Sequence, residues 1–255
     1  MKLAARSNFV NLLHRPYYTE IENEDHSCSR NELARRLGSA LRDLGLRLSD
    51  IGLVVIGSCG ISLCAGDLRT AMIQEEWSED TLINVCQCIE DESFEPLLNA
   101  LHAVRSGTVE LAVAVWLTGK RKSRHLSISA IALSSQRFGI QANYFGIARF
   151  GNTSLSGWFE GATDQAAYEG LVRWAVLNSI NIADTSHISL RANSEIDVET
   201  LSYRLDAQPK KFSTHRSSSE VLGEAIRRTS DSRSVIICDV TAIGQVVTIL
   251  VEPTN

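Results

Sequence analysis

The order helix, turn, buried strand occurs twice in this chain, and this repetition constrains the fold more than any other feature of its 255 residues. In the first copy, leucines at helical spacing precede a polar turn at Asp50 and the apolar run IGLVVIG (51–57). In the second copy, a helical pattern over about 164–178 precedes a turn at Asp184 and an apolar run over about 186–191. Apolar runs without polar alternation are typical of strands buried on both faces of a parallel sheet.

A second pair of similar segments follows these. Residues 96–116 have the pattern of a helix, a tight turn at Ser106-Gly107 and an apolar strand, and residues 219–240 repeat that order. An extended stretch comes after each of them, near 125–135 and 245–252. Helices that alternate with apolar strands predict βαβ units and a mostly parallel sheet.

Two halves and a connection account for the whole chain. We expect an N-terminal half over residues 1–135 and a C-terminal half over residues 164–255. Residues 136–163 are rich in glycine, asparagine and serine, and this composition is typical of a connection. The sequence therefore predicts an α/β protein built by duplication.

The overall charge excludes some classes of partner. A net charge of −5 and a pI of about 5.7 do not suit nucleic acid, whose partners carry a basic face. No apolar run approaches the roughly 20 residues that cross a bilayer, and the first residues lack the apolar core and cleavage site of a signal peptide. We expect a cytoplasmic protein without a membrane or nucleic-acid partner, whose cysteines are reduced and mostly inert.

The sequence gives no reason to expect a cofactor or a metal. It contains neither a Gly-rich phosphate loop nor a G-x-S-x-G motif. Four cysteines could be imagined as metal ligands, but their spacing is not that of a usual zinc site: Cys59, Cys64, Cys86 and Cys88. The four tryptophans read as core or interface anchors: Trp77, Trp116, Trp158 and Trp174.

Four segments carry a resemblance to a known family. They are LRDLGLRLSDIGLVVIGS (41–58), LLNALHAVRSGTVELAVAV (97–115), HISLRAN (187–193) and ICDVTAIGQVVTILVE (237–252). Together they resemble the thiolase superfamily, and within it the ketoacyl-acyl-carrier-protein synthase III (beta-ketoacyl synthase) branch. The resemblance spans about residues 30–252. It implies a duplicated thiolase-like fold, layered αβαβα with two mixed sheets, whose loops are trimmed relative to the family.

The family's nucleophile is a cysteine at the N-terminus of a buried helix, where free amides and the helix dipole favour the thiolate. The resemblance makes Cys88 the candidate nucleophile and Cys86 its alternate. Counting back from the Arg-Ser-Gly turn at the family's usual helix length reaches Glu90 instead of a cysteine.

Acidic residues crowd the predicted start of this helix: Glu90, Asp91, Glu92 and Glu95. Carboxylates complement the helix dipole, but they oppose the formation of a thiolate beside them. Ser93 as a cap and Pro96 in the first turn place the helix start a few residues after the cysteines. The residues favour buried, inert cysteines at a strand end, and a reactive Cys88 stays an open alternative.

The family's other catalytic groups polarise the thioester carbonyl. The resemblance points to His215 and Asn193 in these roles, with His187 as an alternate. The family's first histidine aligns near Leu190, and the asparagine expected after His215 is absent. Loss of two of the three groups costs several kcal/mol of transition-state stabilisation, since each such donor contributes about 3 kcal/mol.

Two surfaces are candidates for partner binding. A short basic run lies between two predicted strands: Lys120, Arg121, Lys122 and Arg124. The ordinary interpretation is a solvated loop, and the alternative is a docking site for an acidic acyl carrier protein. The resemblance also implies a dimer, formed with itself or with a ketosynthase-like partner, and we expect ELAVAVW (110–116) to be the edge strand.

These observations predict a ketosynthase-like protein of fatty-acid or polyketide-type biosynthesis with a degenerate catalytic centre. We expect a non-condensing partner subunit of an active ketosynthase. One alternative is an active acyltransferase or condensing enzyme that uses Cys88 with acyl-carrier-protein or coenzyme A thioesters. The other alternative is a small α/β module that binds proteins and is not an enzyme.

Overall fold

The chain forms two compact units, one of residues 10–144 and the other of residues 1–9 and 145–255. The computed structural model describes residues 10–14, 16–22, 30–59, 63–87, 93–119, 125–135, 145–154, 187–192, 208–212, 217–229, 235–240 and 245–253.

The strands of residues 10–144 pair in a mixed arrangement. They are β1 (Val10–Leu12), β2 (Tyr17–Glu22), β3 (Leu53–Cys59), β4 (Leu82–Gln87), β5 (Leu111–Gly119) and β6 (His125–Ser134). The order is β4-β3-β5-β6, and both β1 and β2 pair with β6. Strands β4, β3 and β5 are parallel to one another, whereas β6 is antiparallel to β5, β1 and β2.

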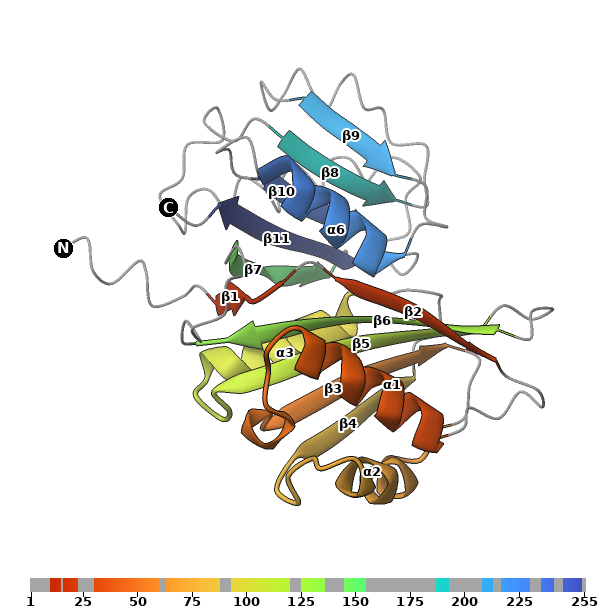
Figure 1. The fold of residues 1–255 in the computed structure, drawn as a ribbon. Helices are drawn as coiled ribbons and strands as arrows, with labels where there is room; N and C mark the ends of the chain where they lie inside the picture. The colour runs from red at the N-terminus through yellow and green to blue at the C-terminus, as the bar shows by residue number, and fades with distance from the viewer. Residues whose placement is uncertain are drawn as a thin grey trace. The chain divides into compact units, whose positions relative to one another are not determined.

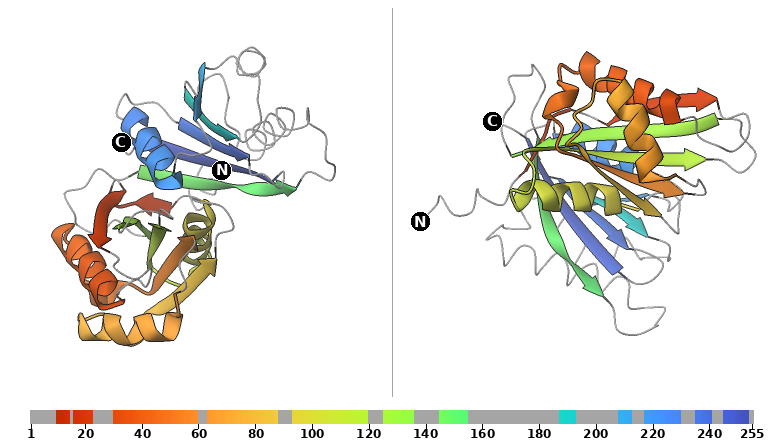
Figure 2. Two further views of the ribbon diagram at one scale, coloured as in Figure 1. Left: turned by 90° about the vertical axis from the view of Figure 1, so that its right-hand side faces the viewer. Right: turned by 90° about the horizontal axis from the view of Figure 1, so that it is seen from below.

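Helices cover both faces of these strands. They are α1 (Arg30–Asp43), α2 (Ala65–Gln74) and α3 (Glu95–Arg105), and a short 3-10 turn, η2 (Leu48–Asp50), precedes β3. Helices α1 and α2 lie on one face and α3 lies on the opposite face (Figure 1; Figure 2). Alternate residues of β3, such as Val54 and Ile56, join the leucines of α1 in one buried cluster. This alternation follows from the two-residue period of a strand.

Helices α1 and α3 both end at a glycine with positive φ, which is 82° at Gly45 and 75° at Gly107. After α1, the N–H of Leu46 donates to the carbonyl of Leu41 across 3.0 Å. A bond of this kind satisfies one of the last helical carbonyls, and glycine reaches the required backbone conformation at the lowest cost. The predicted turn at Ser106-Gly107 therefore ends α3 as expected from the sequence.

The second unit contains strands β7 (Phe145–Ser154), β8 (His187–Ala192), β9 (Gln208–Phe212), β10 (Val235–Val240) and β11 (Gln245–Pro253), with helix α6 (Ser218–Thr229). Their order is β9-β8-β10-β11-β7. Strands β9, β8 and β10 are parallel, and β11 is antiparallel to both β10 and β7. Helix α6 packs on β10, β11 and β8.

The two units repeat one topology. In each, three parallel strands are followed by an antiparallel strand, which pairs on its far side with one more antiparallel strand or strand pair. The third parallel strand, β5 or β10, comes directly after a helix, α3 or α6. The duplicated α/β plan predicted from the sequence is therefore present.

Two expectations need correction. The segment ELAVAVW, expected at the edge, belongs to β5, and β5 lies between β3 and β6. Strand β4 is the terminal strand of this unit, since it pairs only with β3 among the described strands. In addition, residues 136–163 were expected to form a connection, but they contain the ten-residue strand β7. Among the described helices, none is both long and apolar enough to cross a membrane.

Candidate functional site

The start of helix α3 is the candidate functional site. The carboxyl ends of the parallel strands β4, β3 and β5 lie at one edge of the sheet, and the chain passes from the end of β4 into α3. Ligands of α/β proteins bind at such edges. Cys88 and the acidic residues 90–92 fall in this passage, outside the described residues.

Cys86 is the cysteine that the structure describes at this site. It lies on β4, one residue from the strand's end, and is partly buried. The side-chain amide of Asn99, on α3, donates a hydrogen bond to its sulfur across 3.4 Å. Burial is the main cause that raises the pKa of the Cys86 thiol; the Asn99 bond lowers it, and the Glu95 carboxylate raises it. This thiol is protonated at neutral pH and is a poor nucleophile.

Helix α3 begins at Glu95, close to the start that the sequence suggested, but its N-cap residue is Phe94 and not Ser93. Ser93 Oγ accepts a hydrogen bond from the N–H of Glu95 across 3.0 Å, and Pro96 occupies the first turn, where its missing N–H costs nothing. The carboxylate of Glu95 lies in the same turn. Glu95 complements the helix dipole but opposes a negative charge on a neighbouring thiol.

Trp116 is a residue of this site that the sequence analysis interpreted only as a core or interface anchor. Its Nε1–H donates to the carbonyl of Ser93 across 2.9 Å, and only 3% of the residue is exposed. Phe94, next to Ser93, is 1% exposed. The sequence signal was the alternation Ala112, Ala114, Trp116 along one face of β5, in which the only large residue comes at the carboxyl end of the strand.

The other predicted site residues are not brought together by the described part of the chain. His187 begins β8, and in the strand register it lies opposite Val235 and Gln208. Asn193 and His215 fall outside the described residues, as does the basic run Lys120, Arg121, Lys122 and Arg124. Their roles stay predictions. Among the described residues, no group of three or more His, Cys, Asp or Glu side chains could hold a metal ion.

Comparison with known proteins defines the class of fold. No protein-family model matches the chain, and no curated protein matches it in sequence. Among solved structures, the tetronic acid condensing enzyme AbyA1 is similar, with a TM-score of 0.65 and 13% identity over 96% of this chain and 100% of that one.

Two other solved structures are similar over comparable lengths. The Acat5 thiolase from Ascaris suum, in complex with coenzyme A, has a TM-score of 0.70 and 8% identity over 96% of this chain and 100% of that one. The 3-oxoacyl-(acyl carrier protein) synthase III, FabH, from Xanthomonas oryzae has a TM-score of 0.61 and 7% identity over 96% and 97%. The fold is therefore thiolase-like, as the sequence resemblance implied. At these identities the likeness establishes the fold alone.

Proposed function

We propose that this chain is a ketosynthase-like protein of fatty-acid or polyketide-type biosynthesis that does not itself condense acyl groups. It serves as the partner subunit of an active ketosynthase, or pairs with itself, in the cytoplasm. The observation that carries the proposal is the state of the Cys86 thiol beside α3. Burial and the Glu95 carboxylate raise its pKa, which disfavours the thiolate of a condensing centre at Cys86, the alternate to Cys88.

Strand β4 is the surface proposed for pairing. It is the terminal strand of its unit, and its first residue, Leu82, is 51% exposed. Ile73, on the helix that precedes β4, is 40% exposed. A terminal strand can add a strand from another chain through its outward backbone groups, and exposed apolar side chains beside it add affinity. The pairing surface expected on β5 is replaced here by β4.

Two further parts of the proposal come from the sequence. The layered αβαβα order with two mixed sheets is what the resemblance implies, and α3 packed on β5 and β3, like α6 packed on β10, supplies one helix layer for each unit. The basic run Lys120, Arg121, Lys122 and Arg124 is the proposed docking site for an acidic acyl carrier protein.

The test of the partner role is affinity purification of the tagged chain from its native host, with identification of the proteins that remain bound. We expect a cysteine-bearing ketosynthase-like protein, or a second copy of this chain by light scattering. Leu82→Lys should disrupt the complex, because it places a charge at the pairing strand. Tyr18→Lys is the matched control, since Tyr18 is 60% exposed on β2. A monomer that retains no ketosynthase-like protein contradicts the proposal. The remaining interpretation is then a module that binds proteins of another kind.

An active acyltransferase is the second candidate, because AbyA1 is described as a condensing enzyme. In that case Cys88 takes an acyl group from a coenzyme A or carrier-protein thioester, with Asn193 and His215 or His187 assisting. Intact-protein mass spectrometry after incubation with acyl-coenzyme A tests it. An adduct that disappears in Cys88→Ser, but persists in Cys86→Ser, supports the second candidate and contradicts the partner proposal.

A further inference from the structure

The side chains of β5 beneath α3 change abruptly in size. Val113 and Val115 belong to the buried cluster on the side of α1, so Ala112, Ala114 and Trp116 point to the side of α3. The two alanines leave room for α3, which packs mainly on β5 and β3. Trp116 comes next in the row, where α3 begins. The row of small side chains beneath the helix therefore ends in an indole beside the start of α3.

The indole of Trp116 is fixed in place. Its Nε1–H donates to the carbonyl of Ser93, the residue before Phe94, and the side chain is almost fully buried. Burial of the ring and the hydrogen bond of its N–H both stabilise a tryptophan side chain in this position. Helix α3 therefore begins against an aromatic side chain supplied by the neighbouring strand.

The strand register connects this aromatic side chain with Cys86. Gly57 of β3 lies opposite Cys86 of β4 on one side and opposite Trp116 of β5 on the other. The three residues form one row across the sheet, on the face that carries α3, and the middle one has no side chain. Removal of the indole would thus leave a space beside a glycine and a thiol, next to Ala114 on the same face of β5.

We propose that Trp116 occupies the place at the head of α3 where an apolar ligand chain would lie, and that it thereby excludes the hydrocarbon chain of acyl thioesters from this chain. The inference deepens the proposed function, on which it rests, because a partner subunit whose own site is filled carries no acyl group. Trp116 acts by occupying space and takes part in no reaction.

Calorimetric titration of the purified full chain with decanoyl-N-acetylcysteamine tests the proposal. This thioester is uncharged, so the acidic side chains near α3 do not decide the outcome. We expect no saturable binding to the wild-type protein and one-to-one binding to Trp116→Ala, at least about tenfold tighter than to the control. The control is Trp77→Ala, which removes an equally buried tryptophan, 3% exposed, from the cluster on the side of α1.

Two further variants distinguish the effect of the space that the indole fills from the effect of its hydrogen bond and from unfolding of the protein. Trp116→Phe keeps most of the filling but lacks the N–H, and we expect it not to bind. Should Trp116→Ala fail to fold by circular dichroism, Trp116→Leu opens part of the space and should still bind the thioester. The proposal is overturned if the wild-type protein binds as tightly as Trp116→Ala. It is equally overturned if the folded opening variant binds no better than Trp77→Ala.

The outcome is independent of the partner test, because the titration uses the isolated chain. A wild-type protein that binds the thioester and still co-purifies with a ketosynthase-like protein removes the exclusion role and keeps the partner role. A protein that has no partner, but binds the thioester only after Trp116 is replaced by a smaller residue, contradicts the partner role and supports the exclusion role.

Discussion

The side-chain amide of Asn99 donates a hydrogen bond to the sulfur of Cys86 across 3.4 Å, and this bond joins the second turn of α3 to the end of β4. It is the one of three influences that lowers the pKa of the thiol, whereas burial and Glu95 raise it. The net result is a protonated thiol beside the start of a helix. The two side chains that act on it can be changed separately.

The first prediction concerns these two side chains. Glu95→Gln removes a nearby negative charge and should lower the pKa of Cys86, whereas Asn99→Leu removes a donor to the sulfur and should raise it. The pH profile of iodoacetamide alkylation at Cys86, followed by peptide mass spectrometry, gives the pKa separately from accessibility. Exposed Cys64 is an internal reference. Shifts of the same sign in the two variants contradict this account.

The raised pKa of Cys86 also predicts how stability depends on pH. At a pH above the ordinary thiol pKa, the unfolded chain loses this proton more readily than the folded chain does, so the free energy of unfolding falls as pH rises. Cys86→Ala should remove that part of the decline. Urea unfolding between about pH 7 and about pH 10 measures it. A wild-type curve that stays parallel to that of Cys86→Ala throughout is evidence against the raised pKa.

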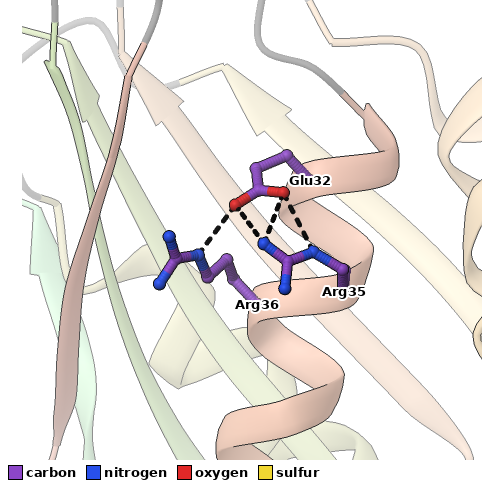
Figure 3. A network of polar contacts seen from close by, with 3 residues as sticks. All are labelled: Glu32, Arg35 and Arg36. Carbon is purple, nitrogen blue, oxygen red and sulfur yellow. Dashed lines mark hydrogen bonds and ion pairs between the residues drawn. The ribbon is translucent and has the colours of Figure 1, made fainter.

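A network of hydrogen bonds and ion pairs on the surface of α1 gives a prediction about stability at acidic pH. Glu32 accepts hydrogen bonds from Arg35 and Arg36, with the shortest distance to each being 2.7 Å (Figure 3). These bonds lower the pKa of the Glu32 carboxyl, so its stabilising contribution is present above the ordinary carboxyl pKa and is lost as pH falls through the lowered value.

Because Glu32 is partly exposed, Glu32→Gln should cost at most about 1 kcal/mol near neutral pH, and less in high salt. Chemical unfolding at two salt concentrations measures this difference. A cost that is unchanged by salt would mean that packing, and not charge, accounts for the effect of the substitution.

The sequence predicted those parts of the fold that have a strong local period. The leucines of α1, the apolar run of β3 and the Ser106-Gly107 turn after α3 all lie where their patterns placed them. Helix α2 was not anticipated, because in Ala65–Gln74 only Leu68, Ala71 and Met72 are buried. The place of β5 inside the sheet could not be predicted from its own residues, since strand order is set by pairing with distant segments.

The candidate site shows the same division. Local residues indicated the helix start near Ser93 and the acidic surroundings of the cysteines. The partners that define the site, Asn99 for Cys86 and Trp116 for Ser93, are 13 and 23 residues away along the chain. Contacts between residues so far apart in the sequence depend on how α3 packs on the strands. The periodicity of the sequence does not predict that packing.

Gly52 supplies a prediction on packing. A β-carbon added to Gly52 would lie 2.9 Å from Cγ1 of Val109 and 3.0 Å from its Cβ. The backbone cannot move away easily, because Gly52 accepts a hydrogen bond from Leu82 across 2.9 Å and donates one to Leu111 across 3.0 Å. Gly52→Ala should therefore cost about 1–3 kcal/mol.

A double-mutant cycle tests the origin of this cost. Val109→Ala removes the Cγ1 methyl group, so Gly52→Ala should cost less in that background than in the wild-type protein. Gly66→Ala is the comparison without a steric conflict, because the nearest atom to its added β-carbon is Sγ of Cys64 at 3.9 Å. An equal cost of Gly52→Ala in both backgrounds shows that the Cγ1 methyl group of Val109 is not the cause.

His14 gives the last prediction. It lies in the gap between β1 and β2, is 6% exposed, and its Nε2 accepts the backbone N–H of Ala132 across 2.9 Å. The N–H of Leu13 donates to the carbonyl of Ala132 across 3.0 Å, so residues 13 and 14 bond to β6 on its side away from β5, between the stretches that pair with β1 and with β2. His14→Ala leaves a buried donor without this acceptor and should lower the free energy of unfolding by about 1–3 kcal/mol.

Urea unfolding of His14→Ala and His14→Gln distinguishes the hydrogen bond from simple filling of space. The glutamine side chain has a carbonyl oxygen that can accept the N–H of Ala132, so His14→Gln should recover part of the loss. If His14→Ala stays within the about 0.5 kcal/mol that is typical of surface substitutions, the bond does not stabilise the junction of β1 and β2. If both variants lose the same amount, the histidine acts through its shape, because an acceptor alone does not replace it.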